Sequence, residues 1–93
     1  MKIFAGKAYG MHTKLKILAS GTLREKIVRY LYPHVDAEGH VTLTVSRAFI
    51  AAYLAVSRPS LSSELGAMQR DGIIQATGRS IRITDMDLFE SYL

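Results

Sequence analysis

Residues 45–71 read VSRAFIAAYLAVSRPSLSSELGAMQRD, and this stretch decides the fold. Ser46 is a residue type that caps helix N-termini, so a first helix is expected to begin after it. The residues that this helix turns inward recur at three- and four-residue steps; they are Ile50, Tyr53 and Leu54, with Phe49 alongside. The pattern breaks at residues 55 and 56, which indicates a short first helix followed by a turn.

A second helix is expected directly after the break. Ser57 can cap it, and Pro59 falls in its first turn, where a proline costs no intrahelical hydrogen bond. Its apolar residues lie at i, i+4 and i+7 and form one buried stripe: Leu61, Leu65 and Met68. Because the turn is so short, the two helices must cross steeply, as they do in a helix-turn-helix.

The opposite side of the second helix carries small residues and arginine. At roughly 100° per residue, it consists of Pro59, Ser62, Ser63, Gly66 and Arg70, with Arg58 beside it at the N-terminal end. A helix fits the major groove of DNA, where arginine can bind guanine through two hydrogen bonds and serine can bond several bases. The pattern therefore favours a recognition helix over 57–70, although the same residues also occur on ordinary solvated helix faces.

The segment before this stretch predicts one more helix and a strand. Residues 22–25, TLRE, form a capping box, and an apolar face follows at Leu23, Ile27, Tyr30 and Leu31. Pro33 is expected to close this helix, residues 34–40 to form a turn, and residues 41–45 to form a short alternating strand.

The segment after it predicts a hairpin and a last helix. Residues 73–76 and 80–83 read as strands around Thr77, Gly78 and Arg79, so the hairpin 73–83 would be a wing whose tip offers backbone N–H groups to phosphates. Asp85 can cap the last helix, whose apolar residues are expected to pack on the core: Met86, Phe89 and Leu93.

Composition limits the class of protein. Ninety-three residues with 48% apolar content suit one small folded domain at 21–93 with a modest core. No apolar run is long enough for a membrane span, no signal-peptide pattern begins the chain, and the absence of cysteine excludes disulfides and thiolate metal sites. These features suggest a cytoplasmic protein. The net charge of +4 suits a phosphate-rich partner.

Catalysis finds little support. His12, His34 and His40 lack the close spacing of metal ligands, and no nucleophile elbow, phosphate-binding loop or dinucleotide fingerprint occurs. We therefore expect no enzyme, no metal and no cofactor in these residues. Residues 1–20 carry apolar positions alternately four and three residues apart, like a coiled-coil seam weakened by Gly6 and Gly10. This segment is expected to be either an amphipathic helix on its own domain or the end of a dimerisation helix.

The segment SRAFIAAYLAVSRPSLSSELGAMQRDGII, with the strand IRI after it, resembles the C-terminal winged-helix domain of CRP/FNR-type bacterial transcription regulators. GTLREKIVRYL resembles the helix that opens that domain, and residues 1–20 resemble the end of the long dimer helix that joins it to a sensor domain. The fold class implied is α+β, mainly α: a three-helix core with a β-hairpin wing and an N-terminal helix from the dimer helix.

The resemblance also implies roles for residues. Arg58 would read bases, Ser57, Ser60 and Ser62 would lie near phosphates or bases, and Arg47 would grip a phosphate. Gly78 and Arg79 would form the wing tip. Ser63 stands where many members carry a second base-reading arginine, Pro59 replaces an acidic reader of some members, and Ala55 stands where glycine is common.

The resemblance implies double-stranded DNA with a palindromic operator as the partner, bound by a homodimer, with RNA polymerase as a further candidate partner. The effector of a sensor domain cannot be read from these residues. The alternative is a winged helix used only for protein–protein interaction. DNA is favoured because four arginines fall on the expected side: Arg47, Arg58, Arg70 and Arg79.

Overall fold

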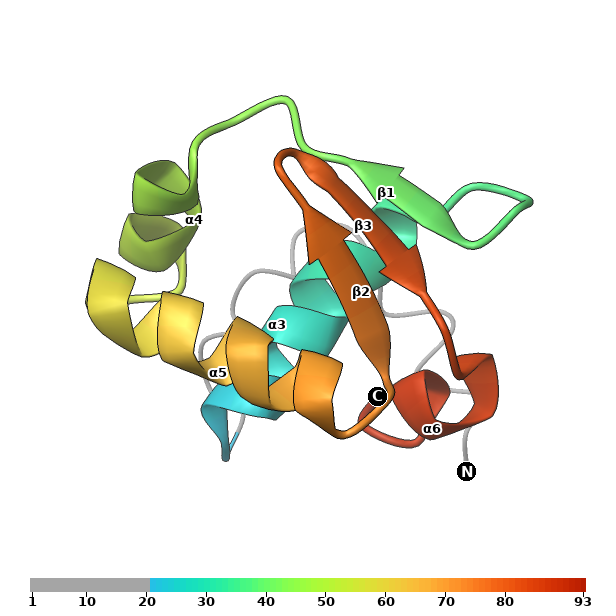
Figure 1. The fold of residues 1–93 in the computed structure, drawn as a ribbon. Helices are drawn as coiled ribbons and strands as arrows, with labels where there is room; N and C mark the ends of the chain where they lie inside the picture. The colour runs from blue at the N-terminus through green and yellow to red at the C-terminus, as the bar shows by residue number, and fades with distance from the viewer. Residues whose placement is uncertain (1–20) are drawn as a thin grey trace, which may run out of the picture.

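The computed structural model describes residues 21–93, so the helix expected at 1–20 lies outside the described residues. The described part is mainly helical with one antiparallel sheet, which confirms the predicted winged helix-turn-helix (Figure 1). In chain order the elements are α3 Leu23–Leu31, the 3-10 helix η1 Tyr32–His34, β1 His40–Thr42, α4 Arg47–Tyr53, α5 Arg58–Arg70, β2 Ile74–Thr77, β3 Ser80–Ile83 and α6 Met86–Glu90.

Helix α3 opens with the predicted capping box. The Thr22 hydroxyl accepts a hydrogen bond from the Glu25 backbone N–H, and the Glu25 carboxylate accepts one from the Thr22 N–H, each at 3.1 Å. These two bonds satisfy donors that a helix N-terminus otherwise leaves unpaired. The α-helix ends at Leu31 as predicted, and Pro33 lies within the short 3-10 helix that follows.

The sheet has the strand order β1-β3-β2, so the wing is part of a three-stranded sheet. The predicted strand at 41–45 is shorter and begins earlier, because after Thr42 the chain leaves the sheet toward α4. The Leu43 N–H still reaches the wing, where it donates to the Arg79 carbonyl at 2.7 Å. The hairpin turn is also tighter than predicted: Thr77 belongs to β2, and only residues 78 and 79 separate the strands.

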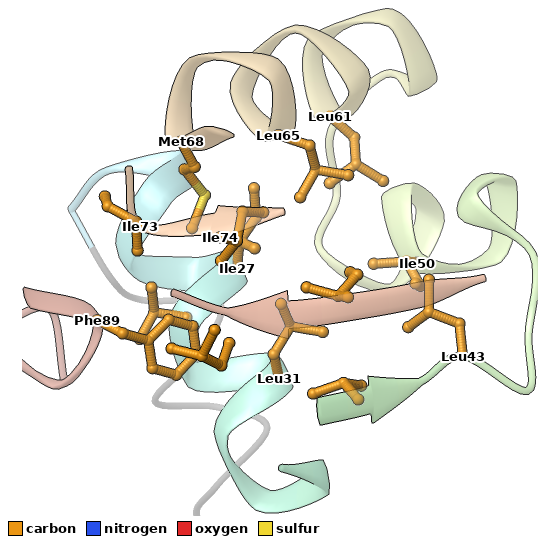
Figure 2. Close-up of a cluster of buried hydrophobic side chains, with 14 of the residues drawn as sticks. Ile27, Leu31, Leu43, Ile50, Leu61, Leu65, Met68, Ile73, Ile74 and Phe89 are labelled. Atoms are coloured by element: carbon orange, nitrogen blue, oxygen red, sulfur yellow. The ribbon is translucent and has the colours of Figure 1, made fainter. Parts of the chain in front are cut away.

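The sheet turns one face to the core and the other to solvent. Val41, Ile81 and Ala76 lie side by side on the inner face, while His40, Arg82 and Gln75 form a neighbouring row on the outer face. Side chains of α3 and α5 meet this inner face in one cluster, which Figure 2 shows around Ile27, Leu31, Leu65 and Met68. The three predicted stripe residues of α5 are all buried: Leu61, Leu65 and Met68.

The turn between α4 and α5 follows from the end of α4. The Val56 N–H donates to the Ala51 carbonyl at 2.9 Å and the Ala55 N–H to the Ala52 carbonyl at 3.1 Å. This is the Schellman arrangement, which needs a left-handed residue after the helix. Ala55 supplies it with φ of 62°, although alanine adopts this conformation less readily than glycine.

Two packing predictions were wrong. Phe49 was expected beside the inward residues of α4, but it is 52% exposed, because Ile50 and Ala51 occupy the narrow buried face of this seven-residue helix. Leu93 was expected on the core, but it is 43% exposed, because α6 ends at Glu90 and the chain turns away. Asp85 caps α6 as predicted, and Phe89 is fully buried.

Candidate nucleic-acid interface

The N-terminus of α5 is organised by two serines. The Ser57 hydroxyl accepts a hydrogen bond from the Ser60 N–H at 3.1 Å and donates one to the Ser60 hydroxyl at 2.9 Å. Both serines are exposed, and Pro59 follows the cap in the first turn as predicted. The start of the helix is therefore well defined and its exposed surface consists of short side chains.

The outer side of α5 is open to solvent along its length. Arg58, Pro59, Ser62, Ser63 and Arg70 are exposed, and Gly66 is half-buried. The Arg70 guanidinium folds back toward Gly66, because its Nη1 atom lies 3.6 Å from the position that a Cβ at residue 66 would take. This side of α5 therefore begins with Arg58, continues with short side chains, and ends where the Arg70 guanidinium lies over Gly66.

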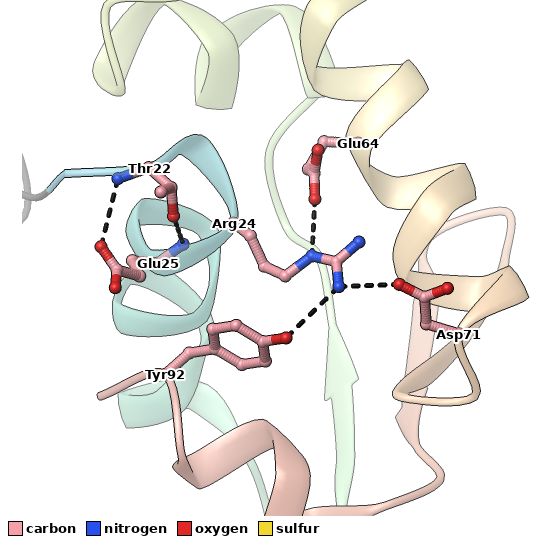
Figure 3. Close-up of polar contacts among 6 residues, drawn as sticks. All are labelled: Thr22, Arg24, Glu25, Glu64, Asp71 and Tyr92. Carbon is pink, nitrogen blue, oxygen red and sulfur yellow. Dashed lines mark hydrogen bonds and ion pairs between the residues drawn. The ribbon is translucent and has the colours of Figure 1, made fainter.

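Helix α5 has one acidic residue, Glu64, and its C-cap is another, Asp71. Both side chains point away from the outer side of the helix and bind Arg24. The Arg24 Nε atom donates to the Glu64 carboxylate at 2.6 Å, and its Nη1 atom donates to the Asp71 carboxylate at 2.8 Å (Figure 3). The Tyr92 hydroxyl lies 3.4 Å from the same Nη1 atom. The hydrogen bonds to Tyr92, Glu64 and Asp71 raise the pKa of the Arg24 guanidinium, so this residue stays charged.

The wing tip is attached to the body of the domain. Gly78 has φ of 60°, the left-handed conformation that the tight turn requires, and its carbonyl accepts a hydrogen bond from the Arg47 Nη2 atom at 3.4 Å. Two residues before the tip, on the free edge of β2, the Gln69 side-chain oxygen accepts a hydrogen bond from the Ala76 N–H at 2.8 Å. These contacts tie the hairpin to both helices of the helix-turn-helix.

The structure brings some of the predicted residues together. Arg47 meets Gly78, and Ser57 meets Ser60, whereas the side chains of Arg58, Arg70 and Arg79 make no hydrogen bond or ion pair within residues 21–93. Sequence reasoning missed Arg24 and Gln69, which position α5 and the wing. One signal was present for Arg24, since the acids Glu64 and Asp71 stand seven residues apart and so share one side of a helix.

Charge is distributed unevenly over the described domain. The exposed arginines lie on α5 and the hairpin: Arg58, Arg70, Arg79 and Arg82. Apart from Asp71, the exposed acids lie in the turn before β1 and on or beside α6: Asp36, Glu38, Asp85, Asp87 and Glu90. These segments are at the right of Figure 1, whereas α4 and the first half of α5 are at the left. The helix-turn-helix side therefore carries the positive potential that attracts phosphates.

Residues 21–93 contain neither a candidate metal site nor a candidate membrane span. No group of three or more histidine or acidic side chains is arranged to hold a metal ion there. None of the helices in that range is both long and apolar enough to cross a membrane.

The fold and the exposed side of α5 define a winged helix-turn-helix domain. Residues 25–92 match the model of the Crp-like helix-turn-helix domain family, and the chain belongs to this family. No curated protein sequence matches the chain. The family match supports DNA-binding transcription regulation as its class of function.

Solved structures of proteins from three bacteria share the fold. TTHB099, a CRP-family transcriptional regulator from Thermus thermophilus, is 29% identical with a TM-score of 0.74 over 87% of this chain and 45% of its own. FixK2 from Bradyrhizobium japonicum is 21% identical with a TM-score of 0.78 over 97% of this chain and 48% of its own. A mutant of CooA from Carboxydothermus hydrogenoformans is 18% identical with a TM-score of 0.73 over 86% of this chain and 40% of its own. The chain thus spans less than half the length of these proteins.

Proposed function

We propose that the chain binds double-stranded DNA in a sequence-specific manner as the DNA-binding domain of a CRP/FNR-type transcription regulator in the cytoplasm. Helix α5 with its cap, residues 57–70, enters the major groove, and the hairpin, residues 73–83, contacts the backbone. The observation that carries this proposal is the outer side of α5, where short side chains and arginines are exposed while both nearby acids are bound to Arg24.

Roles follow from position. Arg58, at the first turn of α5, contacts the edge of a guanine, and the serines around it contact neighbouring bases or phosphates: Ser57, Ser60, Ser62 and Ser63. Pro59 makes no polar base contact, so its part of the site is read through shape and apolar contact. Arg70 lies at the far end of the same side and contacts a phosphate.

Arg47 and the wing tip contact the DNA backbone together. Within residues 21–93 the Arg47 guanidinium donates one hydrogen bond, to the Gly78 carbonyl, so its other N–H groups remain able to bind a phosphate. Arg79 follows Gly78 directly and is exposed. This arrangement would place two cations and the tip of the hairpin on one strand of the duplex.

In the cell, the domain would act within a homodimer. Two copies related by a twofold axis would place their α5 helices about 34 Å apart, one turn of DNA, on a palindromic operator. RNA polymerase is a further partner that regulators of this type meet at a promoter. An effector would belong to a sensor domain and not to residues 21–93.

The experiment is selection of bound sequences from random duplex DNA, followed by a salt titration of binding to a selected duplex and to a scrambled one. We expect one enriched motif, tighter binding of the selected duplex, and affinity that falls steeply as salt rises, because bound arginines release counterions. In Arg79→Ala, the slope of log K against log salt should fall by roughly 1, with equal loss on both duplexes.

An affinity that does not change with salt concentration, or a selection that enriches no motif, would contradict sequence-specific DNA binding. One observation would then favour a protein partner instead. The Phe49 ring is 52% exposed and stacks on Tyr53 at 6.4 Å between centroids, so α4 shows an aromatic surface to solvent. Apolar surface of this kind is more typical of protein contacts than of phosphate contacts.

A further inference from the structure

Arg24 joins the helix that opens the domain to the helix proposed to enter the groove. It lies in the first turn of α3, with a side chain only 17% exposed, and its guanidinium extends between Glu64 and Asp71 (Figure 3). The ring of Tyr92 lies 5.7 Å from the guanidinium carbon and covers it from the C-terminal end of the chain. Arg24, in α3, therefore contacts two segments that are far from it in the sequence, residues 64–71 and Tyr92, and never reaches the outer side of α5.

The two acids are placed to control how α5 is rotated. Glu64 and Asp71 are seven residues apart, which puts them on one flank of the helix with about 10.5 Å between them along its axis. The apolar stripe of α5 packs on the core without a strong directional preference, because burial of apolar surface is non-directional. Two charge-assisted bonds to one rigid guanidinium are directional, so they can fix the rotation of α5 about its axis where the apolar contacts cannot.

The opposite flank of α5 is held as well. Gln69 lies on the other side of the buried stripe from Glu64, at roughly 100° per residue, and its side-chain oxygen accepts the Ala76 N–H of β2 at 2.8 Å. Helix α5 thus lies between α3, which holds it through two charge-assisted bonds, and the wing, which α5 supports through one neutral bond. Only the outer side remains free: Arg58, Pro59, Ser62, Ser63 and Arg70.

We propose that Arg24 is a positioning residue for DNA recognition, which sets the rotation of α5 so that Arg58 and Ser62 face the bases. This inference rests on the proposed DNA binding. It requires the planar, two-pronged guanidinium and not merely a positive charge, because the Nε and Nη1 atoms bind two different carboxylates at once.

The test compares Arg24→Lys with Arg29→Lys in the full chain. Lysine keeps the charge but lacks the fork. Arg29 is a matched control on the same helix, since its Nη2 atom donates to the Leu93 carbonyl, an acceptor outside α5. The probes are one duplex selected from random DNA by the unaltered chain and a scrambled duplex of the same composition.

We expect Arg24→Lys to raise the Kd for the selected duplex roughly tenfold, as for one lost charge-assisted hydrogen bond. The scrambled duplex should change less than about twofold and the salt slope should stay the same, because no charge is lost. Arg29→Lys should leave both duplexes unchanged. Equal weakening on both duplexes, or binding like that of the unaltered chain, would overturn the positioning role.

A second measurement needs no DNA. Residual dipolar couplings of the α5 amides report the orientation of α5 relative to α3, and they should change in Arg24→Lys and in the double variant Glu64→Gln, Asp71→Asn, but not in Arg29→Lys. Unchanged couplings would overturn the inference even if DNA binds. Should the unaltered chain bind no duplex, the proposed function fails, while a changed orientation would still support Arg24 as the residue that positions α5.

Discussion

Helices α4 and α5 end with the same backbone motif but with different residues in its left-handed position. After α5 this residue is Gly72 with φ of 80°, and after α4 it is Ala55 with φ of 62°. In both cases the two N–H groups that follow the helix bond carbonyls of its last turn. Ala55 therefore carries backbone strain at the turn on which the helix-turn-helix depends.

We predict that Ala55→Gly stabilises the domain by roughly 1 kcal/mol. Glycine removes a left-handed strain of about 1–2 kcal/mol but adds about 0.5–1 kcal/mol of conformational entropy to the unfolded chain. Ala55 is exposed, so its methyl group contributes little packing. Urea unfolding measures the change. The matched control is Gly72→Ala, where no atom would lie within 4 Å of the new Cβ, so the loss of stability there should be left-handed strain less the entropy removed from the unfolded chain, with no steric clash.

Arg58 carries the prediction about base recognition. It is exposed at the first position of α5 and its guanidinium is free of hydrogen bonds within residues 21–93. Arg58→Ala should cost ~1–3 kcal/mol of binding to the selected duplex and abolish the preference at one base pair. Competition assays with duplexes altered at each position measure this. Equal losses on selected and scrambled duplexes would contradict a role in reading bases, and the free energy of unfolding should not change.

At the scale of elements, the hairpin is supported by its neighbours. Strand β3 lies between β1 and β2, and β2 has a free edge on which the Ala76 N–H bonds Gln69 of α5. A two-stranded hairpin alone is only marginally stable in water. The third strand and the bond from α5 explain why the wing holds a fixed place beside the recognition helix.

Gln69→Ala should therefore loosen the wing. Removal of the acceptor leaves the Ala76 N–H unpaired at the sheet edge and should lower the free energy of unfolding by about 1 kcal/mol. Binding to selected and scrambled duplexes should weaken to the same extent, because the wing is proposed to contact backbone and not bases. Gln75→Ala, on the exposed face of the same strand, is the control and should change neither quantity. A loss confined to the selected duplex would contradict this role of the wing.

At the scale of the whole molecule, the last helix belongs to the core. Phe89 is fully buried, and its ring lies 6.5 Å from that of Tyr32, so the C-terminal segment closes the side of the cluster away from α4 (Figure 2). Within residues 21–93 every α-helix and strand contributes a buried side chain to one core cluster, and the 3-10 helix η1 contributes none. In so small a domain each large side chain is a sizeable part of the total stability.

Phe89→Ala should lower the free energy of unfolding by about 3–5 kcal/mol through lost burial and the cavity left behind. Domains of this kind have roughly 5–15 kcal/mol in total, so the midpoint of thermal unfolding should fall steeply and DNA binding should disappear with the fold on heating. Leu93→Ala, at an exposed position in the same segment, should change stability by less than about 0.5 kcal/mol. Calorimetry of both variants measures these changes, and equal losses in the two would contradict the role of Phe89 in the core.

The predictions from sequence that held are those whose causes are local. The caps at Thr22, Ser46, Ser57 and Asp85 were predicted because a cap bonds a backbone group only three residues away. The buried stripe of α5 was predicted because its period is a property of the helix itself. The order of helices and strands follows from these signals, and so does the composition of the outer side of α5.

Only the tertiary structure decided which distant residues meet. Arg24 and Glu64 are forty residues apart and Arg47 and Gly78 thirty-one, so no helical or strand period relates them. The third strand of the sheet, the exposure of Phe49 and Leu93, and the position of α5 between α3 and the wing depend on how all elements share one core. Side-chain identity sets local conformation, but the rotation of a helix in a domain is set by contacts on every side of it.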